Sequence, residues 1–440
     1  MRKARLNSFF AGIGGFEKAF EDAGAESAFF CERDPFCRSV LKRHWPAVED
    51  AIDIESVDPE QLPKAEIWTA GFPCQDVSVA RGWLGREGLQ GKRTGLFYSF
   101  LKLVEANRPE VVMLENVTGL LNSHAGQDFA IILQSLTALG YGVSWRVLNA
   151  RYFGSPQSRP RVFICAWYRQ VGLAIDSLFE PSATKPAGKE RAGFLTPCKS
   201  AESGAIVPEV AYCLAATSGR HTGTDWSRSY VSYWNEVRRL TPVECEALQG
   251  FSSNWTLPGP EFTQPADDID TLRYHALGNA VCVPVMRWIA KRIISNLARK
   301  RGRLESRTAM QLTQAMNLRF MKKPTIEDLS EDRTSIKWFS GGCAAESAVV
   351  QGPSSPAPSK PIFKKLIDII ESGSIDKRYY LSANAAAGIL RRVNGQGRTL
   401  FKPLHGALTR LAGAGSSEFA QDLRTTFSES TTCQTSSLFD

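Results

Sequence analysis

The sequence is poor in the residue patterns that bind metals or form disulfides. Its five histidines are scattered, and its ten cysteines include no CxxC pair and no other tight spacing. Because zinc sites need cysteine and histidine ligands at short spacings, we predict no metal centre. A disulfide framework is typical of small secreted domains, whereas this chain has 440 residues and no secretory signal. We therefore expect reduced thiols and a cytoplasmic protein.

Long apolar runs are also missing. The apolar stretch that begins at Leu6 ends at Gly12, which is too short for a signal peptide core or a membrane span. At 43% hydrophobic residues, the chain has enough apolar side chains for two or three domains with real cores. A formal charge of +8 favours a polyanionic partner but does not identify one.

The N-terminal region has the pattern of a nucleotide-binding unit. A buried strand over Leu6–Phe10 runs into a turn with Gly12, Gly14 and Gly15, and a helix follows. Glu32 ends the next apolar run, where its carboxylate could accept both ribose hydroxyls. The pair Asp53–Ile54 could meet an adenine. The pattern favours an adenosine-bearing cofactor, although a tight turn without a ligand fits the glycines alone.

Cys74 is a candidate nucleophile. It follows the apolar strand Ile67–Ala70 and the rigid residue Pro73, and a thiolate at a strand end is a good nucleophile. A buried structural cysteine is the alternative. The segment 75–94 is rich in glycine, arginine and lysine. A loop of that length is typical of a lid or a binding loop, the alternative being a plain surface loop.

A second group of polar residues follows later strands. Glu115 ends the apolar run Val111–Leu114, on the same sheet edge as Cys74, and an apolar pocket would raise its pKa so that it holds a proton. Arg159 and Arg161 precede the strand Val162–Ala166. Alternate residues of an extended segment face the same side, so both guanidinium groups could bind a carbonyl oxygen, a carboxylate or a phosphate.

Strands and helices alternate to about residue 168, which predicts a mostly parallel sheet covered on both faces. From there to about residue 235 the pattern dissolves, and aromatic residues lie among cations such as Arg220 and Arg228. That mixture suits a nucleic-acid surface or the core of a small β domain. Helices are predicted to begin at Pro242, capped by Thr241, and at Val283.

The C-terminal third has weaker signals. Residues 299–307 are strongly basic, residues 340–361 have the composition of a flexible linker, and residues 362–372 have helical spacing. Ser382 precedes a predicted capped helix over Ala383–Val393. We predict either an additional DNA-contacting module or a structural appendage, followed by a disordered tail.

Several of these segments together resemble DNA cytosine-5 methyltransferases of bacterial and phage type. The glycine turn, Pro73-Cys74-Gln75, Glu115-Asn116-Val117, the segment from Gln157 to Arg161 and Gly278-Asn279-Ala280-Val281 occur in the order seen in that family, over roughly residues 6–298. One departure is Ile52, which precedes Asp53 where the family often has glycine.

The resemblance implies a role for each matching residue. Cys74 would attack C6 of a cytosine, Glu115 would contact N3 and the exocyclic amine, Arg161 the base carbonyl, and Arg159 would lie near the nucleophile. The residues expected around S-adenosylmethionine are Phe10, Gly12, Ile13, Gly14, Gly15, Glu32, Arg33, Asp53, Ile54, Pro73, Leu96, Asn279 and Val281. Those expected at the DNA are Gln75, Ser78, Arg81, Arg86, Lys92, Arg93, Arg220 and Arg228.

The resemblance also implies an architecture. We expect an α/β, Rossmann-like methyltransferase fold with a small irregular or β target-recognition domain and a C-terminal extension. The predicted divisions are a catalytic domain at 1–168 and 272–298, target recognition at 169–271, a basic segment and linker at 299–361, a helical module at 362–415 and a tail at 416–440.

We expect a monomer that methylates double-stranded DNA, as the methyltransferases of restriction-modification systems do. Two alternatives stay open: methylation of tRNA, and an inactive DNA-binding homologue. A cysteine protease is disfavoured, because no histidine lies in a recognisable partner motif.

Overall fold

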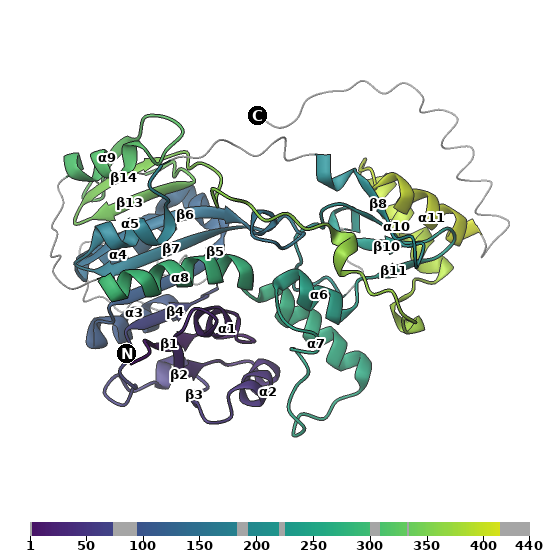
Figure 1. The fold of residues 1–440 in the computed structure, drawn as a ribbon, viewed down its shortest axis with the longest axis horizontal. Helices are drawn as coiled ribbons and strands as arrows, with labels where there is room; N and C mark the ends of the chain where they lie inside the picture. Colours follow the sequence, from purple (N-terminus) through teal and green to yellow (C-terminus); the bar gives the residue numbers. More distant parts are fainter. Residues whose placement is uncertain are drawn as a thin grey trace.

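The protein consists of a larger unit built on a ten-stranded sheet and a smaller unit built on a four-stranded sheet, which lie side by side (Figure 1). The computed structural model describes residues 2–73, 95–182, 192–219, 225–299, 309–331 and 334–413. Predicted site residues outside these ranges are Cys74, Gln75, Ser78, Arg81, Arg86, Lys92, Arg93 and Arg220. The predicted tail also lies outside them.

The large sheet combines a parallel half and an antiparallel half. In order across the sheet, the strands are β12 (Thr325–Asp328), β14 (Ala348–Gly352), β13 (Gly341–Ala345), β6 (Tyr141–Asn149), β7 (Pro160–Tyr168), β5 (Val111–Val117), β4 (Ile67–Ala70), β1 (Arg5–Phe9), β2 (Glu26–Cys31) and β3 (Glu49–Ala51). Pairing from β5 to β3 is parallel, and pairing from β12 to β5 is antiparallel. The prediction of a mostly parallel sheet is therefore right for one half only.

Helices cover both faces of this sheet, as an α/β fold requires. One face packs against α1 (Gly15–Glu21), α2 (Pro35–His44), α5 (Val171–Leu178) and α8 (Val283–Arg299). The other face packs against α3 (Leu96–Asn107) and α4 (Gln127–Ala138). Side chains from the two faces form two separate hydrophobic cores, and the sheet lies between them. This arrangement holds the ends of the parallel strands rigidly in place.

The smaller unit is an antiparallel sheet with two groups of helices beside it. Its strands are, in order, β11 (Val237–Arg239), β10 (Tyr230–Ser232), β9 (Ile206–Pro208) and β8 (Pro197–Lys199). The helices α10 (Ala383–Gly395) and α11 (Lys402–Gly413) share a hydrophobic core with Tyr230 and Val237 of this sheet. The helices α6 (Pro242–Gln249) and α7 (Ala266–Asn279) lie between the two units (Figure 1).

Two helix starts confirm predictions from the capping residues. The Thr241 side chain accepts from the backbone N–H of Glu244, and the Glu244 carboxylate accepts from the N–H of Thr241, which is a complete capping box for α6. The Ser382 side chain accepts from the N–H of Ala385 and starts α10. Each cap accepts a backbone N–H bond in the first turn of its helix, which helps to fix the residue at which that helix begins.

The predicted flexible linker at 340–361 is wrong for residues 341–352, because they form β13 and β14 and extend the large sheet beyond β6. Its small residues are required by close packing. A Cβ atom on Gly342 would lie 2.3 Å from the Trp145 ring, and one on Gly341 would lie 2.8 Å from the Phe179 ring. Glycine here permits two aromatic rings to cover the strand, a use that composition does not distinguish from a linker.

Two further predictions need correction. The predicted helix over 362–372 is only a short 3₁₀ turn, Leu366–Ile369, because neighbouring backbone donors pair elsewhere: Ile362 N–H with Tyr152 O and Leu366 N–H with Glu209 O. The helix α5 lies in the predicted target-recognition range but packs on the large sheet and α8. The other predicted domain boundaries remain predictions.

Candidate active site

A cavity of about 530 Å³ lies at the carboxyl ends of the parallel strands, and the last turn of α7 closes its far side. Phe10 follows β1, Glu32 follows β2, Gly71 follows β4, and Glu115 belongs to β5. The carboxyl edge of a parallel sheet is where α/β proteins bind ligands, and the volume suits a small-molecule ligand.

Most of the cofactor residues expected from the sequence line this one cavity. They are Phe10, Gly12, Glu32, Arg33, Asp53, Ile54, Pro73, Leu96 and Asn279. Four others do not line it: Ile13, Gly14, Gly15 and Val281. The cavity also contains Glu115, Arg159 and Arg161, so the structure brings every described catalytic candidate to the same place.

Only one glycine of the turn after β1, Gly12, lines the cavity, and the packing of Gly14 and Gly15 explains why those two do not. Gly12 and Gly14 have φ angles of 56° and 85°, which side chains disfavour. A Cβ on Gly14 would lie 2.4 Å from the Trp45 ring, and one on Gly15 would lie 2.6 Å from a Val281 methyl. Gly14 and Gly15 therefore serve helix packing, whereas Gly12 faces the ligand space.

Glu32 is held by backbone donors on both oxygens. Its Oε2 accepts from the N–H of Gly12 at 2.7 Å, and its Oε1 accepts from the N–H of Asp34 at 2.8 Å. Burial raises the pKa of this carboxyl group, and the two backbone bonds oppose the rise. Each carboxylate oxygen keeps a second lone pair, so Glu32 is oriented to accept hydroxyl groups from a ligand.

Glu115 and Arg161 form a partly desolvated ion pair in the cavity wall. Arg161 Nε lies 3.3 Å from Glu115 Oε1, and the two side chains are 16% and 11% exposed. Burial raises the pKa of Glu115 above its ordinary value, while Arg161 and, more weakly, Arg159 oppose the rise. Glu115 is therefore suited to holding a proton that it can donate to a bound base.

Arg159 is buried, and its guanidinium group links two segments of the backbone. Its Nη1 donates to Leu214 O at 2.7 Å, and its Nη2 donates to the carbonyl oxygens of Gly278 and Ala280 at 2.9 and 2.8 Å. It thus ties the segment after β9 to the end of α7. Burial lowers its pKa, but a guanidinium stays charged at any physiological pH.

Sequence reasoning missed Cys213. Its sulfur lies 3.5 Å from Arg159 Nη1 and 3.7 Å from Arg161 Nη2, so it accepts weak hydrogen bonds from both arginines. No spacing in the sequence singles out this cysteine among the ten. Only the fold shows that the segment after β9 returns to the catalytic edge.

Asn116 anchors the backbone that leads to the predicted nucleophile. Its Nδ2 donates to Phe72 O at 2.9 Å, and its Oδ1 accepts from the N–H of Val117 at 2.8 Å. Pro73 lines the cavity and is the last described residue before Cys74. The motifs around Cys74 and Glu115, far apart in sequence, are thus joined by a buried hydrogen bond.

Further cavity-lining residues were not predicted as site residues. They are Cys31, Asp34, Cys37, Ile52, Gly71, Phe72, Asn116, Val117, His275, Ala276, Gly278 and Ala280. Several lie directly beside a predicted residue, and adjacency to a motif would have found them. His275 gave no signal, because α7 itself was not predicted.

Arg228, the one described residue of the predicted DNA set, lies in the smaller unit. Its Nη1 donates to Ser218 O at 3.3 Å and its Nη2 donates to Thr217 Oγ1 at 3.2 Å. The side chain is half-buried, and burial lowers its pKa. It does not line the cavity with Glu115.

The family model of C-5 cytosine-specific DNA methylases matches residues 4–201 and 198–295, more than half of the chain. The chain belongs to this family. The methylase is 31% identical over 322 residues to Type II methyltransferase M2.BsuMI of Bacillus subtilis, covering 68% of this chain and 76% of that protein. It is 32% identical over 321 residues to Type II methyltransferase M.HaeII of Haemophilus aegyptius, covering 68% of this chain and 95% of that protein. The predicted activity is confirmed: the methylase methylates C5 of cytosine in DNA.

A similar solved structure is the DNMT2 mutant of Spodoptera frugiperda, 17% identical, with a TM-score of 0.48 over 66% of the methylase and 99% of that chain. The two-faced α/β sheet of the methylase agrees with the predicted Rossmann-like class. Within its described residues, the methylase has no group of three or more potential metal ligands. Among the same residues, no helix has the length and apolar character to cross a bilayer.

Proposed function

We propose that this enzyme transfers a methyl group from S-adenosylmethionine to C5 of a cytosine in a specific sequence of duplex DNA, through transient addition of Cys74 to C6 of the flipped-out base. We further propose that it works as a monomer in the cytoplasm. The observation that supports the chemistry best is the partly desolvated Glu115–Arg161 pair in a cavity whose wall includes Pro73.

The cavity fits the cofactor. Glu32 presents two oriented oxygens for the ribose hydroxyls, and Asp53 and Ile54 also line the cavity, where they would contact the adenine. Gly12, with open space where a Cβ would be, allows close approach of the ligand to the backbone. The cofactor, when bound, supplies an electrophilic methyl group on a sulfonium. The residues of the chain that would hold it are thus mainly those after β1, β2 and β3.

Glu115 and Arg161 would act on the cytosine ring. Cytosine C5 is a poor nucleophile until a thiolate adds at C6, because that addition moves electron density onto C5 and N3. A protonated Glu115 can donate its proton to N3 as the thiolate adds, and Arg161 can donate to the base carbonyl oxygen. Once C5 carries the methyl group, a base removes the C5 proton, the C6–sulfur bond breaks to release the thiolate, and N3 returns its proton to Glu115, which restores the aromatic ring.

The target base must leave the helix for this chemistry, since C6 cannot be reached inside a duplex. The cavity lies in the larger unit, and Arg228 lies just before β10 of the four-stranded sheet in the smaller unit beside it (Figure 1). We assign that sheet to target recognition. The remaining predicted DNA contacts, from Gln75 to Arg93 and Arg220, lie outside the described residues.

A covalent trap tests the proposal. Bisulfite sequencing of DNA from cells that express the enzyme would first identify the methylated sequence. Duplexes of that sequence containing 5-fluorocytosine should then form a denaturation-resistant adduct with the enzyme in the presence of S-adenosylmethionine, because fluorine cannot leave as a proton does. Cys74→Ser should methylate nothing and form no adduct. Absence of the adduct with the wild-type enzyme, despite binding of both ligands, would rule out the covalent route.

A further inference from the structure

Residues 353–381, which follow β14, form a strap that contacts both units. The family match ends at residue 295, and β14 ends at Gly352 at the far side of the large sheet. From there the chain runs across the junction of the units to α10 and α11 (Figure 1). Ile362 N–H donates to Tyr152 O at 2.9 Å, and Leu366 N–H donates to Glu209 O at 2.8 Å. The strap therefore contacts both sides of the junction.

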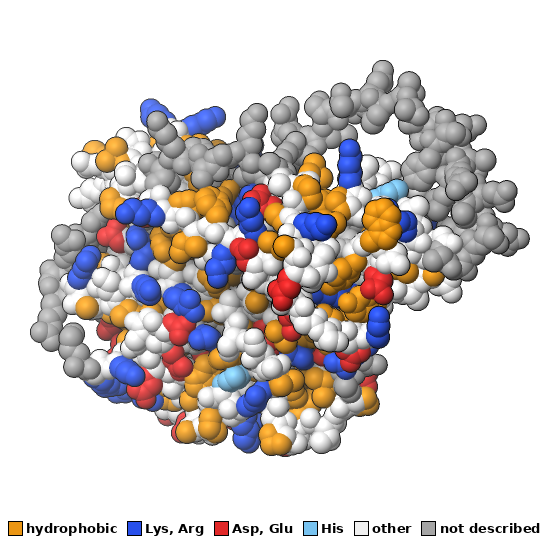
Figure 2. All heavy atoms as spheres, turned by 45° about the vertical axis from the view of Figure 1, so that its right-hand side comes forward, with side chains coloured by type: hydrophobic (Ala, Val, Ile, Leu, Met, Phe, Trp, Pro, Cys, Tyr) orange, Lys and Arg blue, Asp and Glu red, His pale blue; other side chains and the backbone are white. Residues whose placement is uncertain are grey.

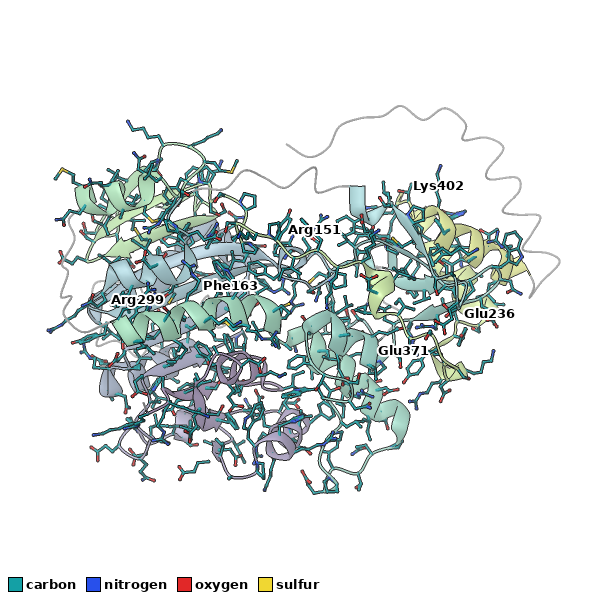
Figure 3. The ribbon with its side chains drawn as sticks, in the orientation of Figure 1. Arg151, Phe163, Glu236, Arg299, Glu371 and Lys402 are labelled. Carbon is teal, nitrogen blue, oxygen red and sulfur yellow. The ribbon has the colours of Figure 1, made fainter. Side chains whose placement is uncertain are left out.

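The strap next joins a buried ion pair at the start of α6. Arg238 of β11 makes a two-pronged ion pair with Glu244, with both side chains fully buried. Glu371 N–H donates to Glu244 Oε1 at 3.0 Å, and the Glu371 carboxylate accepts from the Thr241 hydroxyl. Figure 3 shows Glu371 beside α6, at the boundary between the units. The strap thus completes the polar network that links β11 to α6.

A third contact reaches α7. Tyr379 Oη donates to Asp270 Oδ2 at 2.7 Å, and Arg378 Nη2 lies 3.0 Å from the same oxygen. Asp270 also pairs with Arg273, whose Nη2 lies 3.0 Å from Glu246 Oε1 of α6. Asp270 is 7% exposed, so its charge is compensated by these groups rather than by water.

The same short segment is bound to the target-recognition sheet. Leu381 N–H donates to Val237 O at 2.8 Å, and Tyr380 forms an antiparallel bridge with Arg238. Arg239 Nη2 donates to Arg378 O at 3.2 Å. Residues 378–381 therefore hold β11 on one side and α7 on the other. The opposite end of α7 carries Gly278 and Asn279 into the cavity.

We propose that Tyr379 is a positioning residue for the methylation reaction: by binding Asp270 while its neighbours bind β11, it fixes the target-recognition sheet relative to the catalytic cavity. DNA must contact both units at once. If the two units are already fixed relative to each other before DNA binds, less conformational entropy is lost on binding. The inference uses the proposed assignment of the four-stranded sheet to target recognition. Tyr379 lies outside the segments that the family model matches.

Tyr379→Phe removes the hydroxyl that donates to Asp270 and keeps the ring. Since hydrogen bonds to charged groups contribute more than neutral ones, we expect KM for cognate duplex DNA to rise about tenfold. The cofactor Kd of the DNA-free enzyme and kcat should stay within about twofold, because the cavity atoms are unchanged. Tyr380→Phe is the matched control, since its hydroxyl faces Tyr233 of the smaller unit and not α7.

Steady-state methylation kinetics, cofactor calorimetry and thermal unfolding separate the possibilities. A purely structural role would lower the unfolding temperature of Tyr379→Phe and leave KM at the wild-type value, which would overturn the proposal. Equal KM increases in Tyr379→Phe and Tyr380→Phe would also overturn it. If Tyr379→Phe does not fold, Arg378→Gln removes a more exposed donor to the same Asp270 oxygen and should raise KM in the same direction. A wild-type enzyme that fails to methylate DNA would instead contradict the proposed function.

Discussion

Arg161 Nε lies 3.3 Å from Glu115 Oε1 in the wall of the catalytic cavity, and the two residues belong to the neighbouring strands β7 and β5, two positions apart in register. In the β5–β7 ladder Glu115 is opposite Phe163, and Val117 is opposite Arg161. The pairing register therefore places a carboxyl group and a guanidinium within reach on one wall. The pKa of Glu115 is still raised by burial, so the ion pair does not fully offset the loss of water.

Glu115→Gln should reduce the methylation rate by about 100-fold or more, since a glutamine amide cannot transfer a proton to N3. The amide is nearly the same size as the carboxyl group, so folding should be retained and cofactor affinity should change only modestly. Single-turnover transfer of a tritiated methyl group measures the rate, and calorimetry measures the affinity. A Glu115→Gln enzyme with wild-type turnover would remove Glu115 from the chemistry.

Cys213 provides a second test of the catalytic wall. Cys213→Ala removes the acceptor shared by Arg159 and Arg161, and we expect kcat to fall about fivefold, the size of a modest hydrogen bond. Cys213→Ser keeps an acceptor and should stay closer to wild type. Cys198→Ala is the control, because Cys198 is also half-buried but belongs to β8. If the Cys213 and Cys198 variants behave alike in initial-rate assays, the sulfur does not orient the arginines.

The catalytic half of the fold could be predicted because its functional residues lie in short sequence motifs at the ends of strands. The glycine turn shows where the first strand ends and the first helix begins. Acidic residues at strand ends, such as Glu32 and Glu115, show which edge of the sheet carries the site. Each of these residues needs only its immediate neighbours to be interpreted. The same logic found Thr241 and Ser382 as helix caps.

The rest depended on contacts between distant segments. Gly342 looks like a linker residue until Trp145 is seen to cover it, and Cys213 becomes important only because Arg159 and Arg161 reach its sulfur. Tyr379 is similar, since its partner Asp270 is 109 residues away in the sequence. Tertiary packing of this kind leaves no local periodicity for a single sequence to reveal. The basic side chains show the same limit: in Figure 2 they are interspersed with acidic ones on the visible face of the larger unit.

Gly12 and Gly14 should respond differently to the same substitution. Both have positive φ, so alanine at either position is strained by about 1–2 kcal/mol. Only at Gly14 would the new methyl group overlap the Trp45 ring, so Gly14→Ala should have the lower free energy of unfolding of the two. Gly12→Ala has space for its Cβ but narrows the ligand cavity, so it should weaken S-adenosylmethionine binding more. Urea unfolding and calorimetry on both variants test this, and equal stabilities would contradict the assigned Trp45 contact.

Glu17 should make the stability of the fold depend on pH. It lies in the first turn of α1 and is fully buried, and burial raises the pKa of its carboxyl group from 4.5 to about 7. Because the folded state binds this proton more tightly than the unfolded state, its contribution is fully present below pH 4.5 and is lost as pH rises through about 7. The total loss is about 3 kcal/mol by linkage.

Glu17→Gln removes that titration while keeping the shape of the side chain. We expect the variant to be more stable than the wild type above pH 7, with a smaller difference at pH 5, when unfolding by urea is followed across this range. Glu60→Gln, at an exposed position, is the control and should leave the pH profile unchanged. If wild type and Glu17→Gln lose stability in parallel from pH 5 to pH 8, the buried carboxyl group of Glu17 does not hold a proton in the folded enzyme.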